Sequence, residues 1–315
     1  MLLYFSHDRR IAIPLAAADR KAYPMDVNTA GAGKIIFDVQ EGSLILRGDP
    51  QAKDVRMMVS IDRMWIFKLG ELDILKRLIA ISGERTPEVT IRTNIPRGIS
   101  NFGGGEYPID FEVVVPDHLK IDVRDTSGKI EISEMKGDIA IQDGSGSLAL
   151  RNLTGRISLK KKSGDVKISD ISAAMTIESE SGQMDIHRVA ELEIRDANGN
   201  LTIMDAASAR VRSRGGNVRI SDVKGDLEVD DESGEIVLRR IAGKTDLKDT
   251  SGQILAEDTG PLRIRDTSGD ITVRRAASLD VVAKESGRIA AEGVTGNVSA
   301  PPGFKVNQLK KNPLP

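Results

Sequence analysis

The sequence predicts an all-β protein: a β-solenoid of about ten turns of 17 or 18 residues, with two short strands per turn, preceded by a β-rich cap that contains one amphipathic helix. Three observations predict this fold. A glycine recurs every 17 or 18 residues, the apolar residues have strand spacing, and residues 112–303 contain no aromatic side chain. A repeat array also suits a chain of 315 residues, which exceeds what one ordinary hydrophobic core fills.

Residues 1–33 are expected to form an N-terminal extension that only partly resembles a secretory leader. Arg9 and Arg10 precede the apolar stretch 11–18, but apolar residues also precede the arginines, and Pro14 interrupts the stretch. A leader begins with its charges and continues with an unbroken apolar run. No run approaches the ~20 apolar residues of a membrane span. We therefore expect no membrane span, and either the cell surface or periplasm, if a leader has been removed, or the cytoplasm.

Residues 34–124 are expected to form the β-rich cap, because stacked strands leave an unpaired edge at the end of an array. Ile35, Phe37 and Val39 are spaced two residues apart, so the stack is expected to begin there in a degenerate form. Further strand patterns occupy 55–61, 89–93 and 107–115.

One segment of the cap has helical rather than strand spacing. Within 69–82, Leu72, Leu75, Leu78 and Ile79 recur at intervals of three and four, against charged residues on the other side. This pattern predicts one amphipathic helix, laid over the end or flank of the coil.

The solenoid itself is expected to occupy 125–300, where glycine marks one corner of each turn. Most of these corners have aspartate first and glycine fourth, as at Asp249 and Gly252, which is typical of a type I turn. We expect this corner to face water, with the aspartate capping the turn. The glycines are Gly128, Gly146, Gly164, Gly182, Gly199, Gly216, Gly234, Gly252, Gly269 and Gly287.

The apolar residues of each turn repeat on the same frame. Their spacing of 2, 3, 4 and 2 residues contains two short period-two alternations, so each turn is expected to supply two strands. One turn alone buries too little apolar surface to fold, so neighbouring turns must stack. One example is Leu148, Leu150, Leu153, Ile157 and Leu159.

Residues 301–315 are expected to end the ladder and form a tail. Pro301 and Pro302 cannot donate ladder hydrogen bonds, and Phe304 is expected to pack on the last turn.

The iterated Ser-Gly-Asp-Val/Ile element links the chain to a known family. It occurs at 163–166 and 268–271, with Lys-Gly-Asp-Ile at 136–139, and follows the strand 111–116. Across about 25–300, this pattern resembles the bacterial "putative adhesin" family of unknown function, which is built from β-strand repeats. The resemblance implies a repeat fold and offers no catalytic residues.

The composition argues against most enzyme chemistry. The chain has no cysteine, and its three histidines, His7, His118 and His187, are scattered; His187 is expected on the surface. With 45 basic against 47 acidic residues, no positive field favours nucleic acid. The glycine loop 101–105 lacks the helix start and lysine of a phosphate site. We therefore expect no catalytic residues, no metal site and no cofactor.

The corner aspartates raise one alternative, since an acidic row could bind calcium. Lys161, Arg212 and Lys284 are expected at equivalent places in other turns, which favours turn capping over calcium binding. The aspartates are Asp125, Asp143, Asp196, Asp231, Asp249 and Asp266.

We expect a non-enzymatic, adhesin-like binding or structural protein, whose solenoid faces contact a protein or a glycan. Its capped ends favour a monomer. The chief alternative is a self-assembling, bactofilin-like scaffold that polymerises end to end. A polysaccharide-active β-helix enzyme is less expected, because the turns from 128 to 287 carry no insertion that could wall a cleft.

Overall fold

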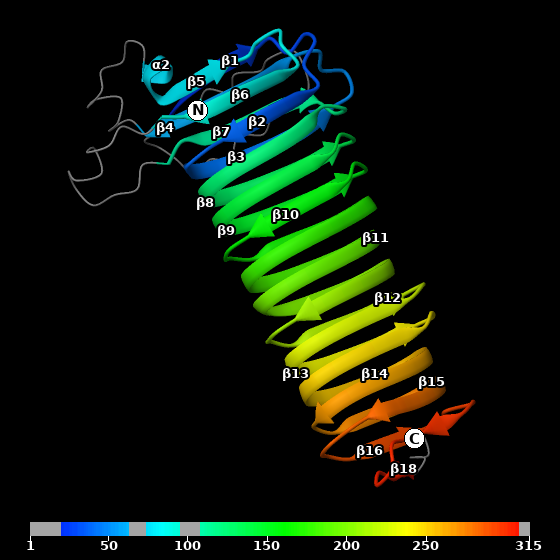
Figure 1. Cartoon of the computed structure of the whole chain (residues 1–315). Helices are drawn as coiled ribbons and strands as arrows, with labels where there is room; N and C mark the ends of the chain where they lie inside the picture. The colour runs from blue at the N-terminus through cyan, green and yellow to red at the C-terminus, as the bar shows by residue number, and fades with distance from the viewer. Residues whose placement is uncertain (1–19, 63–73, 95–107, 309–315) are drawn as a thin grey trace, which may run out of the picture.

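The computed structural model describes residues 20–62, 74–94 and 108–308, and confirms the predicted β-solenoid. Its strands stack into an elongated rod with the N-terminal strands at one end and the C-terminal strands at the other (Figure 1). The strands of this shaft are β8 (Lys120–Met135), β9 (Ile139–Leu153), β10 (Ile157–Lys161), β11 (Val166–Ser213), β12 (Val218–Val223), β13 (Leu227–Ile241), β14 (Thr245–Ser268), β15 (Ile271–Ala283), β16 (Ile289–Glu292), β17 (Val298–Ser299) and β18 (Val306–Gln308). Several of these, β11 above all, run around corners without a break.

Consecutive turns pair in parallel, with each residue beside its counterpart one turn away. Ile157 of β10, for example, pairs with Ile139 of β9 on one side and with Met175 of β11 on the other. The apolar positions that the sequence pattern predicts are buried, and together they form one continuous core along the rod. Stacking like side chains on like therefore buries what a single turn cannot.

The glycine corner requires glycine for two reasons. Gly164 and Gly252 have φ values of 99° and 147°, which L side chains rarely adopt. In addition, a Cβ added to Gly252 would lie 1.8 Å from the carbonyl oxygen of Gly234 in the previous turn. The glycine series predicted from the sequence is thus a column of close backbone contacts.

The second corner has a left-handed residue that is not glycine. Because asparagine and aspartate tolerate this conformation best, they fill many of its positions, and arginine fills others. The next residue is the corner's buried apolar one, as Ile171 follows Asp170. The left-handed residues are Glu134, Asn152, Asp170, Arg188, Asp205, Asp222, Arg240, Asp258 and Arg275, with φ between 53° and 61°.

The turn that stacks directly on β8 comes from a segment far from the shaft in sequence. Strands β2 (Lys34–Asp38) and β3 (Glu41–Asp49) pair in parallel with β8, so this segment forms the turn directly before it. On its other side, β2 pairs with β6 (Glu88–Thr93) and β3 pairs with β7 (Asp110–Pro116). The Ile35 pattern therefore belongs to the stack, as expected, but it does not begin it, because β6 and β7 lie one turn further out.

Antiparallel strands cover the N-terminal end of this stack. Strand β4 (Val55–Asp62) pairs with β7, β5 (Ile79–Ser82) pairs with β6, and β1 (Arg20–Val27) pairs with β4. The change from parallel to antiparallel pairing ends the repeat, and these strands form the cap (Figure 1).

The helix predicted over 69–82 is wrong in its extent. Within the described part of that segment, the helix α2 covers only Ile74–Leu78, and 79–82 is strand β5; residues 69–73 lie outside the described residues. Ile79 and Ile81 alternate with exposed residues and pair with β6. This segment therefore adopts the extended conformation of a strand at the edge of the stack. Tertiary strand pairing has overridden helical spacing here.

The C-terminal end is only partly covered by the described residues. Phe304 packs against the core, as expected. The prolines do not end the ladder, however, because β18 follows them and pairs with β16. Over β17 no further strand lies within the described residues, so Val298, whose counterpart Leu279 is buried, is 45% exposed. None of the described helices is long and apolar enough to cross a membrane.

Candidate functional site

Two adjoining hollows lie on one side of the shaft, over the strand that ends at the glycine corner. One has a volume of about 900 Å³ and the other about 1430 Å³, and both are lined by Asp230 and Lys248. We call this side the hollowed face; its outward side chains include Glu193, Arg210 and Glu228. Small side chains such as Ala174 and Ser208 line the smaller hollow.

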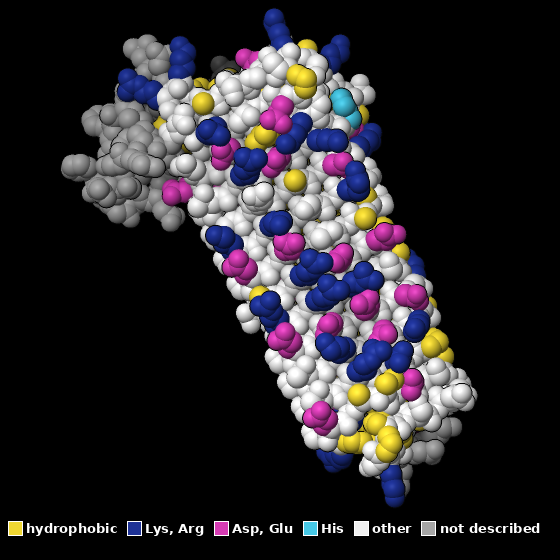
Figure 2. Space-filling view, in the orientation of Figure 1, with side chains coloured by type: hydrophobic (Ala, Val, Ile, Leu, Met, Phe, Trp, Pro, Cys, Tyr) yellow, Lys and Arg dark blue, Asp and Glu magenta, His cyan; other side chains and the backbone are white. Residues whose placement is uncertain are grey.

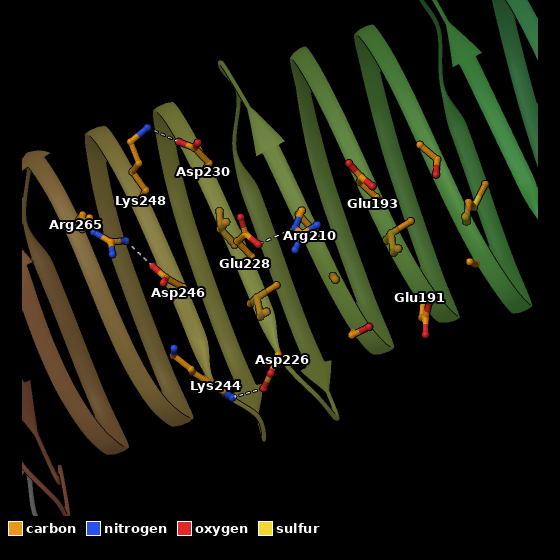
Figure 3. A pocket seen from close by; sticks show the side chains of 18 residues that line it. Glu191, Glu193, Arg210, Asp226, Glu228, Asp230, Lys244, Asp246, Lys248 and Arg265 are labelled. Atoms are coloured by element: carbon orange, nitrogen blue, oxygen red, sulfur yellow. Dashed lines mark hydrogen bonds and ion pairs between the residues drawn. The ribbon is translucent and has the colours of Figure 1, made fainter.

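Ion pairs between neighbouring turns line the smaller hollow (Figure 3). They are Arg210 with Glu228 at 2.7 Å, Lys248 with Asp230 at 3.0 Å, and Arg265 with Asp246 at 2.8 Å. Such pairs arise because the repeat places side chains of adjacent turns about 4.8 Å apart. Each leaves oxygen acceptors and N–H donors exposed on a rigid strand surface.

The larger hollow reaches the glycine corner and holds cations without an ion-pair partner among the described residues. These are Lys162, Arg212 and Arg214, and the small residues Gly144 and Ala197 line the same hollow. Most other lysines and arginines of the shaft, such as Lys160 with Glu178 at 2.9 Å, are paired.

Charged side chains of both signs cover the shaft, and hydrophobic ones are few on the face in view (Figure 2). The hollowed face follows this pattern, with donors and acceptors at regular intervals along the rod. A hydroxyl-rich or charged partner can be recognised there through many small polar contacts.

A second feature, which we call the corner column, runs inside the shaft. Its members occupy the last inward position before the glycine corner in successive turns. All but Asp125, which is half-buried, are less than 9% exposed. They are Asp125, Asp143, Lys161, Ser179, Asp196, Ser213, Asp231, Asp249, Asp266 and Lys284.

The expectation that this corner faces water is therefore wrong for its aspartates. Asp143 stands two residues after the buried Ile141, which itself follows Ile139 by two, so strand alternation directs all three inward. This period-two signal could have found the column in the sequence. Capping is nevertheless seen at Asp249, whose Oδ1 accepts the Ser251 backbone N–H at 3.2 Å.

One assignment within the column also needs correction. Lys161 and Lys284 occupy the aspartate position of their turns, as expected, but the placement of Arg212 at that position is wrong. Ser213 pairs with Asp231 and is buried, whereas Arg212 points outward into the larger hollow. The one-residue difference matters because it reverses the face of the strand.

Burial dominates the electrostatics of the column. Desolvation, with the nearby Asp143, raises the pKa of Asp125 to about 7; desolvation, with Asp266 and Asp231, raises that of Asp249 to about 7. Burial also raises the pKa of Asp231 to about 6. Both carboxyl oxygens of Asp125 and Asp231 are buried, which makes their charged forms costly.

Two lysines enter the column. Lys161 Nζ donates to Asp143 Oδ2, and Lys284 Nζ donates to Asp266 Oδ2 and, at 2.7 Å, to the Gly269 carbonyl. The pairing therefore places a buried cation beside a buried carboxyl at two points along the rod.

The remaining residues considered in the sequence are dispersed. His187 is half-buried on β11, and His118 is exposed before β8. The loop 101–105 and His7 lie outside the described residues. Among the residues with described positions, no group of three or more His, Cys, Asp or Glu side chains is arranged to hold a metal ion.

Comparison with known proteins gives a family and distant structural likenesses. The family model described as Toastrack DUF4097 matches residues 87–293. No curated protein matches the chain.

Three solved structures are similar at low identity. A Clostridium sporogenes protein described as a putative cell adhesion protein has 11% identity and a TM-score of 0.35, over 64% of this chain and 99% of that one. A Parabacteroides distasonis protein described as a putative lipid binding protein has 16% identity and a TM-score of 0.36, over 90% and 98%. A putative adhesin from Parabacteroides merdae has 12% identity and a TM-score of 0.29, over 93% and 97%.

The family match spans most of the shaft and the strands β6 and β7 that begin the stack, which is more than half of the chain. It includes the Ser-Gly-Asp-Val/Ile elements at 163–166 and 268–271. The chain therefore belongs to the Toastrack DUF4097 family, a family of unknown function.

Proposed function

We propose that this chain is a non-enzymatic, adhesin-like binding protein that holds a protein or a glycan against its hollowed face. The observation that carries the proposal is the pair of adjoining hollows, about 900 and 1430 Å³, on one side of a regular rod. A partner lying along the rod would meet the same kind of polar row in turn after turn, so that many weak contacts add up.

The character of the hollows favours binding over catalysis. Their walls are strand surfaces, and carboxylates such as Glu228 and Asp246 are held in ion pairs by arginine. A glycan-cleaving site would instead need an acid and a base with differing protonation, facing one bond in a cleft. The polysaccharide-active alternative therefore has the weaker support.

The scaffold alternative is favoured by one observation only. Val298, which stacks on the buried Leu279, is exposed at the C-terminal end of the shaft, where another chain could stack. The antiparallel strands β4, β5 and β1 oppose head-to-tail growth, because they cover the other end. We therefore keep the binding role as the proposal.

A binding screen with paired variants tests this role. The purified chain is applied to a microarray of neutral, acidic and amino-sugar glycans and to a panel of purified surface proteins. The double variant Arg210→Glu with Lys248→Glu alters the hollowed face. Exposed ion pairs contribute little to stability, so it is expected to fold. Any captured ligand should bind at least about tenfold more weakly, the loss of about 1.4 kcal/mol.

The matched control reverses two exposed arginines on the opposite face, Arg219→Glu with Arg239→Glu, which also form ion pairs between turns. It should retain binding. No captured ligand in the screen, or an equal loss of binding in both double variants, would contradict the use of the hollowed face.

A further inference from the structure

The two lysines of the corner column stand apart from the other cations of the shaft. The side chains of Lys161 and Asp143 are both 0% exposed, and those of Lys284 and Asp266 are 0% and 1% exposed. Every other ion pair between residues 120 and 292 leaves at least one side chain substantially exposed, as Arg240 with Asp222 does. These two contacts are thus sealed from water inside the rod.

A third carboxyl lies one turn beyond the middle aspartate of each pair, in the same order. Asp125 lies beside Asp143, and Lys161 lies on the other side of Asp143. At the far end of the column Asp249, Asp266 and Lys284 repeat the series Asp, Asp, Lys in successive turns. Between the two triads no lysine enters the column: Asp196 has Ser179 and Ser213 as its neighbours in the column.

We propose that each triad is a site of spontaneous covalent cross-linking, in which the lysine Nζ forms an amide with the Cγ of the middle aspartate. The bonds would join Lys161 to Asp143 and Lys284 to Asp266, and each would tie one turn of the solenoid to the next. Asp125 and Asp249 would act as the proton-transfer groups.

The reaction is a condensation and needs no further reagent. A proton passes from Nζ to the carboxylate, which gives a neutral amine and a neutral acid. The Nζ lone pair attacks Cγ, and a proton moves from nitrogen to the adjacent carboxyl oxygen. The flanking aspartate then gives a proton to the departing hydroxyl and takes one from the other hydroxyl of the same carbon. The C–O bond breaks, one water leaves, and the new C–N bond is an amide.

The surroundings favour each step. Donor and acceptor are held in contact by the strand register, which replaces an encounter by a fixed geometry. A neutral amide also removes two opposite charges from a site where charge is costly. Burial raises the pKa of Asp143 and of Asp266, and the pKa of about 7 at Asp125 and Asp249 leaves each flanking carboxyl able to give and take a proton near neutrality.

Intact-mass spectrometry of the purified full chain, under denaturing conditions, tests the proposal directly. The expected mass is lower than that of the sequence by one water for each bond, hence by two waters. After digestion, branched peptides should join the segment containing Asp143 to that containing Lys161, and the segment containing Asp266 to that containing Lys284.

Loss of water has one other source, because Asp143 precedes Gly144 and Asp-Gly sequences can close to a succinimide. The variant Lys161→Met separates the two sources: it abolishes the deficit of an isopeptide bond and leaves that of a succinimide. Lys160→Met, which changes the adjacent exposed lysine, is the matched control and should keep the full deficit.

The role of the flanking carboxyl is tested by Asp125→Asn. This variant should form the Lys161 bond at least about tenfold more slowly after refolding, while the Lys284 bond forms at its normal rate. Equal rates would overturn the proton-transfer role.

The proposal is overturned at either triad if wild-type protein, kept folded at neutral pH for days, still yields the unlinked lysine peptide. A deficit that survives Lys161→Met would overturn it at the first triad as well. A plain buried ion pair would then be the state of that contact.

Discussion

At the scale of single residues, the solenoid makes the environment of each position depend on its counterpart 17 or 18 residues away. Gly252 has a φ of 147°, and an added Cβ would collide with the carbonyl oxygen of Gly234. Gly303 also has a positive φ, 91°, but an added Cβ would have nothing within 4 Å. The two glycines therefore separate backbone strain from steric collision.

We expect Gly252→Ala to lower the free energy of unfolding by about 3 kcal/mol or more, since strain and collision act together. Gly303→Ala should lower it by only about 1 kcal/mol, because strain acts alone. Urea unfolding followed by circular dichroism measures both. Equal losses of unfolding free energy in the two variants would show that the close stacking at the glycine corner leaves room for a Cβ atom.

Residue patterns predicted the corner glycines and the apolar strand positions. They missed the left-handed residues of the second corner and the buried corner column. The glycine series and the Leu148 pattern are local and periodic, and both are confirmed. The left-handed row was missed because arginine and glutamate, as at Arg188 and Glu134, give no turn signal. The buried corner column was missed because aspartate followed by glycine is read as an exposed turn, although strand alternation directs it inward.

At the scale of elements, the corner column is a row of aspartates, serines and lysines inside a strand stack. Its aspartates disfavour charge, as the raised pKa values of Asp125, Asp231 and Asp249 show. The left-handed row on the surface behaves in the opposite way. Hydrogen bonds from Arg188 hold the pKa of Asp170 below its usual value, and Arg240 does the same to Asp222.

These shifts predict a stability that rises on mild acidification. A raised folded-state pKa means that the folded chain binds more protons than the unfolded chain between about pH 4, the unfolded value, and about pH 7. The stabilising contribution is fully present below that window and is lost as pH rises through it. Surface aspartates with a lowered pKa, such as Asp170, lose their stabilising contribution only as pH falls below about 4.

We therefore expect a higher melting temperature at pH 5 than at pH 8, measured by calorimetry at constant ionic strength. Asp249→Asn removes one carboxyl with a pKa of about 7 and should reduce the difference between the two temperatures. A melting temperature at pH 8 that equals or exceeds the one at pH 5 would contradict the raised pKa values of the buried aspartates in the column.

The cap shows the limit of sequence reasoning about elements. Its strands β4, β6 and β7 fall where alternation predicts them, but the helix pattern misled at Ile79 and Ile81. That 34–49 stacks directly on β8, across a long stretch of intervening chain, is a non-local pairing that no local pattern encodes.

At the scale of the whole molecule, stability is distributed along the rod, because each turn contacts only its two neighbours. Val211, in the middle of the shaft, is 0% exposed, whereas Val298, at the end of a core column, is 45% exposed. The same substitution should therefore have different effects at the two sites.

We expect Val211→Ala to lower the free energy of unfolding by about 2 kcal/mol, through lost burial and the cavity left behind. Val298→Ala should lower it by less than about 0.5 kcal/mol. Chemical denaturation checks both, and a larger effect at Val298 would indicate that another chain or segment covers that end in solution.

The rod as a whole is expected to work singly, through its side rather than through its ends. Size-exclusion chromatography with light scattering, followed by negative-stain electron microscopy of the eluted protein, tests this most directly. A monodisperse, elongated monomer is the result that the covered N-terminal end and the hollowed face predict. Filaments or open-ended assemblies would contradict it, and would favour the end-to-end scaffold.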